Sequence, residues 1–365
     1  MQIQQDYDLT KLNTLGIKAI ARLFVVLERE EDLVELFASP EFQNNKKFFL
    51  GGGSNVLFTK DFDGIVILNK LKGIKILEAP TPQRVGVPTE SVGKDSVYIR
   101  AMGGEVWHDL VSFAVERGLW GIENLSLIPG TVGAAPMQNI GAYGAELKDV
   151  LTSVEAYDLE TGEKKIFTKE ECELGYRDSI FKNRLKDKYF ISAVTLKLSK
   201  IEKKNLDYRV LQEHLAKNKI EATHPRHISD AVVSIRQSKL PDPAVIGNAG
   251  SFFKNVFLTQ EEFNNFQSRY PDVPHFEEDA PSPLTPLQNL ERGRIQYKIP
   301  AAWLIEQCNW KGKRVGNVGV HEKQALVLVN YGGAKGVEVK NLAEDIINSV
   351  FAKFGLTLIP EVNLI

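Results

Sequence analysis

The chain has 365 residues, of which 43% are hydrophobic and 25% are charged, and its formal net charge is −2. These values are typical of a globular protein of two or three domains with a sizeable core. The small net charge and the absence of a long basic run argue against binding to nucleic acid or to a membrane surface.

The polar N-terminus lacks the apolar core of a signal peptide, and no apolar run approaches the roughly 18 residues of a membrane span. Cys172 and Cys308 lie far apart in the sequence, which favours neither a disulfide framework nor a zinc site. The six histidines show no metal-ligand spacing, so we expect no metal. We therefore expect a soluble, cytoplasmic protein.

Short strands alternate with amphipathic helices along the chain, which indicates a mixed α/β or α+β fold. A helix is predicted at 31–38, and a second at 107–118, where Trp107, Leu110, Val111, Ala114 and Val115 share one face and Gly118 ends the helix. Strands are predicted at 20–28, 48–50, 64–69 and 97–101.

Further along the chain, residues 154–167 read as a hairpin, and a helix at 339–354 ends at Gly355 before a terminal strand at 356–365. The LPDP segment at 240–243 is a plausible domain boundary. The Pro-rich, acidic stretch 271–286 is typical of an irregular exposed loop.

Two glycine-rich segments are candidates for binding a diphosphate. Gly51, Gly52 and Gly53 precede Ser54 and Asn55, and consecutive N–H groups without Cβ obstruction can form an anion nest. The segment 129–144 is unusually long for a connection and too apolar for disorder, which favours a functional loop. A plain turn remains an equal alternative for the first segment, which matches neither the dinucleotide fingerprint nor the P-loop.

The segment GNAGSFFKNV at 247–256 places Ser251 behind small residues and ahead of Phe252 and Phe253. We expect Gly250 to take a positive φ and the two aromatic rings to be buried, which leaves the Ser251 hydroxyl and the Asn255 amide available for hydrogen bonds. The alternative is an ordinary turn in which Ser251 caps a backbone amide.

Tyr176 and Arg177 place a phenol beside a guanidinium, a pairing suited to a carboxylate or phosphate. The alternative is that Arg177 simply pairs with Asp178 or with another acid at the surface. Glu361, in an apolar segment, is either a solvent-facing residue or a carboxylate directed into a site. Lys239 and Gln324 are likewise either solvent-facing residues or side chains directed into a site.

Six motifs along the chain form a recognisable set. In chain order they are NTLG (13–16), GGGSNVL (51–57), IPGTVGAAPMQNIGAYG (128–144), GYRDSIFK (175–182), GNAGSFFKN (247–255) and a final PEV. Together they resemble the UDP-N-acetylenolpyruvoylglucosamine reductases over essentially the whole chain. LDYRVL at 206–211 falls where one subclass of that family carries a substrate-contacting tyrosine loop. The Pro-rich insert departs from the family pattern between about 270 and 297.

The resemblance implies a two-subdomain FAD-binding fold of the vanillyl-alcohol-oxidase-like type plus a C-terminal α+β substrate domain. The implied domains are residues 1–72, completed by the terminal strand 355–365, then 73–238, and finally a substrate-binding domain at 239–354. The implied activity is the NADPH-dependent reduction of UDP-N-acetylglucosamine enolpyruvate to UDP-N-acetylmuramate in peptidoglycan synthesis, by a monomer.

The resemblance also implies roles for particular residues. Arg177 and Glu361 would stabilise the substrate carboxylate and enolate, and Ser251 would protonate C2. Tyr176, Tyr208, Lys239, Asn255, Lys311 and Gln324 would bind the UDP-sugar. The FAD contacts would be Gly51, Gly52, Gly53, Ser54, Asn55, Val56, Leu57, Pro129, Gly130, Gly133, Ile140, Gly141, Ala142 and Gly144. Because neither glycine-rich loop contains a His or Cys, we expect FAD to be bound non-covalently.

Two other functions are compatible with these motifs. One is a different flavoprotein of the same fold, an oxidase or dehydrogenase in which Ser251 is only structural. The other is a nucleotide-sugar-binding protein without catalysis. A yellow purified protein would exclude the second of these, and substrate-dependent NADPH oxidation would exclude the first.

Overall fold

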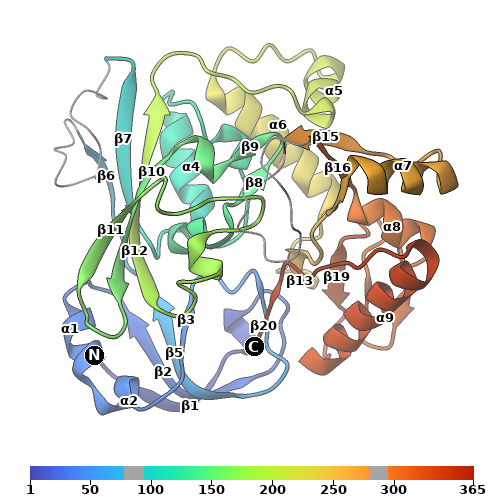
Figure 1. Ribbon diagram of the computed structural model, residues 1–365. Helices are drawn as coiled ribbons and strands as arrows, with labels where there is room; N and C mark the ends of the chain where they lie inside the picture. The colour runs from blue at the N-terminus through green and yellow to red at the C-terminus, as the bar shows by residue number, and fades with distance from the viewer. Residues whose placement is uncertain (78–93, 280–294) are drawn as a thin grey trace. The chain divides into compact units, whose positions relative to one another are not determined.

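The computed structural model describes residues 1–77, 94–279 and 295–365. The chain forms two compact units. The first comprises Met1–Tyr7, Ala21–Gly52 and Asp63–Ser238, and the second comprises Asp8–Ile20, Gly53–Phe62 and Lys239–Ile365. Both units combine helices with sheets (Figure 1), as the alternating pattern of the sequence predicts.

A four-stranded sheet begins the first unit, with the strand order β1-β2-β5-β3. Its strands are β1 (Gln4–Asp8), β2 (Ile20–Leu27), β5 (Phe62–Asn69) and β3 (Lys47–Leu50), and its helices are α1 (Asp32–Ala38) and α2 (Pro40–Gln43). The predictions at 20–28, 31–38, 48–50 and 64–69 are therefore confirmed. Buried side chains of β2, α1 and β5 share one core cluster.

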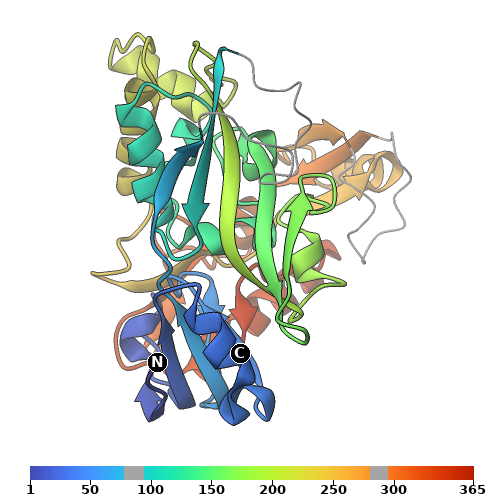
Figure 2. The same ribbon diagram turned by 90° about the vertical axis from the view of Figure 1, so that its left-hand side faces the viewer.

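A five-stranded antiparallel sheet follows, with the order β11-β10-β12-β7-β6 (Figure 2). Its strands are β6 (Ile74–Leu77), β7 (Ser96–Met102), β10 (Leu151–Asp158), β11 (Lys164–Thr168) and β12 (Tyr189–Ser199). Strand β7 and the hairpin β10–β11 confirm the predictions at 97–101 and 154–167.

The predicted helix at 107–118 is α4 (Trp107–Glu116). Its buried residues are Trp107, Leu110, Val111, Ala114 and Val115, the face that the sequence pattern predicts. Gly118, just beyond the helix, has a φ of +68°. The residues of this face join the side chains of the five-stranded sheet in one core cluster.

The rest of the first unit holds α5 (Arg209–Lys217), α6 (Pro225–Lys239) and the short strands β8 (Gly141–Ala142) and β9 (Ala145–Glu146). The segment 129–144 is not structureless, because two 3₁₀ turns, Val132–Ala134 and Pro136–Gln138, precede β8. Such turns form through local contacts and leave no period in the sequence.

Two sheets and three helices dominate the second unit. The sheets are β13 (Gly247–Ser251), β19 (Val327–Asn330), β18 (Val318–Val320) and β17 (Arg314–Val315), then β14 (Val256–Thr259), β16 (Ile295–Ile299) and β15 (Phe276–Asp279). The helices are α7 (Gln260–Arg269), α8 (Ala301–Gln307) and α9 (Gly336–Phe354). Helix α9 confirms the prediction at 339–354, and Gly355 caps it with a φ of +71°.

Two predictions for this unit need correction. The terminal segment 356–365 is not one strand: Pro360 forms an isolated antiparallel bridge with Phe253, and the strand β20 (Asn363–Leu364) pairs, in parallel, with β4 (Val56–Leu57). Pro360, which lacks an N–H, interrupts the segment. The stretch 271–286 is not irregular throughout, since Phe276–Asp279 pairs with β16, whereas 280–286 lies outside the described residues. No helix that the structure describes is long and apolar enough to cross a membrane.

Candidate active site

The two glycine-rich loops touch each other in the first unit. A Cβ on Gly52 would lie 2.9 Å from the Cα of Gly130, and a Cβ on Gly51 would lie 2.3 Å from the Oγ1 of Thr131. These spacings are shorter than real Cβ contacts, so the loops approach as closely as they do because the first loop has no side chains there.

The backbone of these loops offers hydrogen-bond donors that have no partner within the protein. Among the described residues, the N–H groups of Gly51, Gly52, Gly130 and Thr131 donate no hydrogen bond. Unpaired N–H groups on adjoining turns are what a diphosphate requires. The loops therefore fit an anion such as a diphosphate, and the plain-turn alternative leaves these donors unexplained.

In the second unit, the continuation of the first loop is tied to the C-terminus. Gly53 has a φ of +62°, and a Cβ there would lie 1.9 Å from the carbonyl oxygen of Leu12. The Asn55 side chain donates to the carbonyl oxygen of Glu361 at 3.3 Å, and the N–H of Asn363 donates to that of Asn55 at 3.1 Å. Residues more than 300 positions apart thus form one local structure.

Ser251 ends strand β13, and a register shift between Asn248 and Ser251 interrupts its pairing with β19. The segment is therefore a bulged strand rather than the turn that the sequence suggests, since its small residues allow it to pack against its own chain. A Cβ on Gly247 would lie 2.4 Å from the carbonyl oxygen of Leu15, which explains that glycine without a ligand. Gly250 has the expected positive φ, +69°.

The Ser251 side chain is half-buried, and its hydroxyl forms no hydrogen bond among the described residues. The alternative in which it caps a backbone amide is therefore wrong. Phe252 and Phe253 are buried, as predicted. The N–H of Glu361 donates to the carbonyl oxygen of Phe252 at 2.8 Å, so the backbone of Glu361 lies beside the residue that follows Ser251.

Arg177 sits in a strained left-handed conformation, with a φ of +51°. Its Nη2 donates to the carbonyl oxygen of Gly141 at 2.6 Å, and its guanidinium lies 5.5 Å from the ring centre of Tyr176. Asp178 instead accepts hydrogen bonds from the Asn183 amide at 3.0 and 3.1 Å. No Arg177–Asp178 ion pair occurs among the described residues, which removes Asp178 as the partner of Arg177 there.

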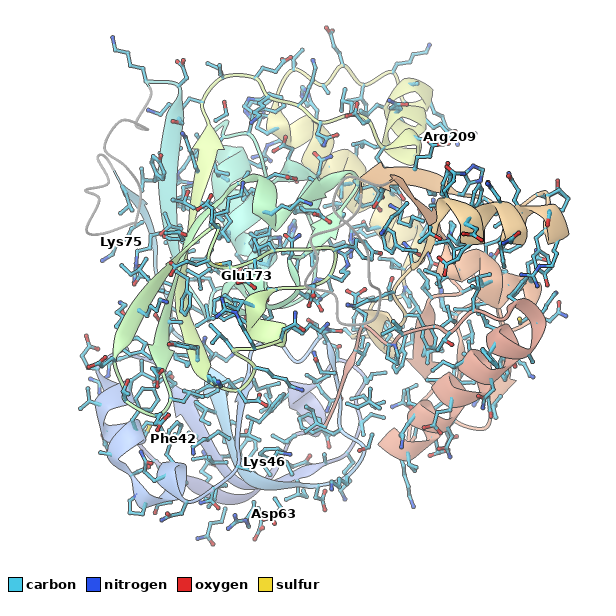
Figure 3. All side chains as sticks on the ribbon, viewed as in Figure 1. Phe42, Lys46, Asp63, Lys75, Glu173 and Arg209 are labelled. Atoms are coloured by element: carbon cyan, nitrogen blue, oxygen red, sulfur yellow. The ribbon has the colours of Figure 1, made fainter. Side chains whose placement is uncertain are left out.

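The predicted tyrosine Tyr208 directly precedes α5, whose first residue, Arg209, is labelled in Figure 3. Its ring meets that of Tyr143 edge-on, with ring centres 5.2 Å apart. The Asn205 side chain donates to the carbonyl oxygen of Gly144 at 2.9 Å and anchors the segment before Tyr208 to the glycine-rich loop.

Sequence reasoning missed Tyr143 and Thr131. Burial raises the pKa of the Tyr143 phenol, which remains a neutral donor at physiological pH. Both residues lie inside the glycine-rich segment 128–144. A large or hydroxyl-bearing side chain among small residues is the sequence feature that could have indicated them as candidate ligand contacts. The sequence pattern points to the glycines of this loop instead, because a residue without a side chain lets a ligand approach the backbone closely.

The other predicted substrate residues make local contacts. The Asn255 side chain accepts from the N–H of Ala301 at 3.1 Å, and that of Gln324 accepts from the N–H of Leu326 at 3.3 Å. Lys311 forms an ion pair with Glu306 at 2.8 Å, and Lys239 is exposed at the end of α6. These contacts do not distinguish ligand-binding from surface roles. No group of three or more potential metal ligands occurs within the described ranges.

The comparisons first define the class of protein. The family model described as "FAD binding domain" matches residues 21–166, and the chain is a flavoprotein with an FAD-binding domain of the vanillyl-alcohol-oxidase type. A solved structure titled "Solvent-stable cholesterol oxidase" has the same fold, with a TM-score of 0.50 and 11% identity over 99% of this chain and 86% of that one. The predicted fold class is confirmed.

The comparisons then define the family. A model described as "UDP-N-acetylenolpyruvoylglucosamine reductase, C-terminal domain" matches residues 242–365. Proteins named UDP-N-acetylenolpyruvoylglucosamine reductase from Flavobacterium johnsoniae and Amoebophilus asiaticus are 43% and 46% identical to it, over 100% of both chains in each case. The crystal structure of the Thermus caldophilus reductase has a TM-score of 0.60 and 21% identity, over 100% of this chain and 98% of that one. The chain belongs to the UDP-N-acetylenolpyruvoylglucosamine reductase family and is a flavoenzyme.

Proposed function

We propose that this enzyme reduces UDP-N-acetylglucosamine enolpyruvate to UDP-N-acetylmuramate with NADPH, in the synthesis of peptidoglycan precursors. The observation that carries the proposal is the Ser251 hydroxyl, which has no partner among the described residues and belongs to a strand joined to the Glu361 segment. A hydroxyl left free in this way is available to a ligand. The two glycine-rich loops would hold FAD, and the chemistry that FAD would supply there is hydride transfer between NADPH and the substrate.

Arg177 is proposed to prepare the substrate for that hydride. An enolpyruvyl ether is electron-rich and accepts a hydride at C3 only if the charge that develops at C2 can spread into its carboxylate. A fixed guanidinium stabilises this charge without having to reorganise. The hydrogen bond from Arg177 to the carbonyl oxygen of Gly141 holds the guanidinium in one orientation.

Ser251 is proposed to donate the proton to C2, and Glu361 to stabilise the enolate. A neutral hydroxyl is a weak acid, but a carbanion is basic enough for the transfer to run downhill. The backbone hydrogen bond from Glu361 to Phe252 supports this assignment, since it fixes the Glu361 segment beside the strand that carries Ser251.

The finer assignments remain proposals. Tyr176, Tyr208, Lys239, Asn255, Lys311 and Gln324 are proposed to bind the UDP-sugar, and Tyr208 to place the chain in the tyrosine-loop subclass. The division into FAD-binding subdomains 1–72 with 355–365 and 73–238, and a substrate domain 239–354, is proposed on the same basis. We also propose that the protein is cytoplasmic, because two unpaired cysteines suit a reducing compartment. The resemblance to the family is the basis for proposing a monomer.

A coupled assay tests this function. The purified protein should be yellow, should release free FAD on acid precipitation, and should oxidise NADPH only when UDP-N-acetylglucosamine enolpyruvate is present. UDP-N-acetylglucosamine, which lacks the enolpyruvyl group, is the control substrate. NADPH oxidation at equal rates with both sugars, or with neither, would contradict the proposal, and flavin left in the acid pellet would contradict non-covalent binding.

A further inference from the structure

Helix α6 carries an arginine that the proposed mechanism does not use. Arg236 follows Ile235, whose side chain belongs to a core cluster with Val232, and the ring of Tyr143 packs against that same cluster. The charge of Arg236 and the Tyr143 phenol act on each other's pKa, which places the guanidinium near the last part of the glycine-rich loop. Its Nε is shielded from solvent and has no hydrogen-bond partner among the described residues.

The surroundings of Arg236 do not compensate its charge. It forms no ion pair or hydrogen bond with any residue that the structure describes. Burial lowers its pKa, and the charge of Arg177 lowers it further, opposed by the nearby Tyr143 phenol. Burial also lowers the pKa of His108, with Arg236 acting in the same direction and Asp109 against it, which favours a neutral imidazole.

Arg236 is half-buried with its Nε shielded from solvent, and a shielded polar donor without a partner is costly unless another group supplies the hydrogen bond. A like charge nearby disfavours the charge of a guanidinium, and an anion beside both arginines would offset that repulsion. Arg177 is fixed to Gly141, and Tyr143, two residues later, contacts Tyr208. The unsatisfied donor thus lies with the residues assigned to the substrate, within one unit of the fold.

We propose that Arg236 is a second guanidinium for the carboxylate of the enolpyruvyl group, acting together with Arg177. A carboxylate accepts up to about four hydrogen bonds, so two arginines can share it. This inference rests on the proposed function, because it adds a residue to the carboxylate site assigned to Arg177. Binding by two guanidinia would favour sugar nucleotides that carry a carboxylate over those that do not.

Equilibrium binding to the oxidised holoenzyme tests the proposal, with changes in flavin absorbance as the signal. UDP-N-acetylmuramate has both a diphosphate and a carboxylate, whereas UDP-N-acetylglucosamine has the diphosphate alone. Arg236→Gln should raise the Kd for UDP-N-acetylmuramate about 10- to 100-fold, the effect expected when a charge-assisted hydrogen bond is lost. The Kd for UDP-N-acetylglucosamine should stay unchanged. Arg236→Lys should lose less, because it keeps the charge but not the planar fork.

Arg226→Gln is the matched control, since Arg226 is exposed on the same helix. Equal weakening of both ligands would overturn the carboxylate assignment in favour of the diphosphate. Unchanged affinities in Arg236→Gln, or loss of FAD with a lowered melting temperature in both Arg236 variants, would overturn it in favour of a structural or cofactor-binding role. If the wild-type enzyme bound neither sugar nucleotide, the proposed function itself would be contradicted. This outcome differs from every outcome above, because those concern the Arg236 variants and not the wild type.

Discussion

At the scale of single residues, Gly52 is the position of the proposed FAD cradle at which the two glycine-rich loops approach backbone to backbone. Its missing Cβ faces the backbone of Gly130, which cannot rotate aside as a side chain could. We expect Gly52→Ala to weaken FAD binding about 10- to 100-fold, because overpacking of this kind costs about 1–3 kcal/mol. The ratio of FAD to protein after gel filtration, followed by FAD titration of the apoprotein, measures the effect.

Gly355→Ala is a control for general destabilisation. Gly355 caps α9 with a φ of +71°, and no atom lies within 4 Å of the position its Cβ would take. The substitution should cost about 1 kcal/mol of unfolding free energy through backbone strain and leave FAD affinity unchanged. Equal loss of FAD in both variants would show that Gly52 acts only on stability.

Tyr208 offers a second residue-scale prediction. Its side chain is 45% exposed, and the rest of the ring lies against Tyr143, so its hydroxyl can reach a ligand from an ordered position. Tyr208→Phe should raise the KM for the UDP-sugar roughly tenfold through loss of a hydrogen bond to a charged group. Reduction of the flavin by NADPH should be unaffected. An unchanged KM for the UDP-sugar would remove Tyr208 from the site.

At the scale of elements, a charge cluster around the buried Glu155 carboxylate joins the segment before the first helix to the five-stranded sheet within the first unit. Arg100 of β7 and Lys164 of β11 both contact the Glu155 carboxylate of β10, each with an N–O distance of 2.7 Å. Lys164 also contacts Glu30, two residues before α1, at 3.0 Å. Burial raises the pKa of Glu155, but hydrogen bonds from Arg100 and Lys164 outweigh it and hold the pKa below its ordinary value.

Removing the Glu155 charge should destabilise the protein. Glu155→Gln removes the buried partner of two partly exposed cations, which keep only Glu30, and we expect a loss of about 1.5–3 kcal/mol in the free energy of unfolding, measured with urea at pH 7. Because the folded-state pKa is depressed, this contribution is present above the unfolded-state pKa and is lost as the pH falls through the folded-state value. The difference between wild type and variant should therefore shrink in acid.

The control is Glu344→Gln, which breaks an exposed ion pair with Lys340. Such a pair is worth about 0.3–0.5 kcal/mol, so the substitution should change stability little. A similar small effect at Glu155, or a Glu155 effect that does not depend on pH, would contradict the role assigned to the cluster.

The elements differ in how far the sequence predicts them. Helix α4 was predictable down to its buried residues, because an amphipathic helix is set by a local period and by the glycine that follows it. The terminal segment was not, because β20 pairs with β4, far away in the sequence, and Pro360 interrupts the apolar run before it. Local patterns carry no information about such distant partners.

At the scale of the whole molecule, the candidate site depends on contacts that no local pattern contains. The sequence predicts that Ser251 and Glu361 act in one site only through the family resemblance, whereas the structure joins their segments through Phe252. The free N–H groups of Gly51 and Thr131 likewise follow from the packing of two loops 80 positions apart. The types of residue in the candidate site could be predicted from the sequence. How these residues lie relative to one another could be learned only from the folded structure.

The central claim is that Ser251 donates a proton to the substrate after NADPH has reduced the flavin. Ser251→Ala removes a hydroxyl that has no partner among the described residues, so the fold and the FAD cradle should be retained. Loss of a general acid should slow reoxidation of the reduced enzyme by UDP-N-acetylglucosamine enolpyruvate about 10²- to 10⁴-fold. This corresponds to roughly 3–5 kcal/mol of barrier.

Stopped-flow measurement of the two half-reactions tests the claim most directly. In Ser251→Ala, bleaching of the flavin absorbance by NADPH should proceed near the wild-type rate, and the return of absorbance on mixing with the enolpyruvyl substrate should be the slow step. Reoxidation at the wild-type rate, or equal slowing of both half-reactions, would contradict the account.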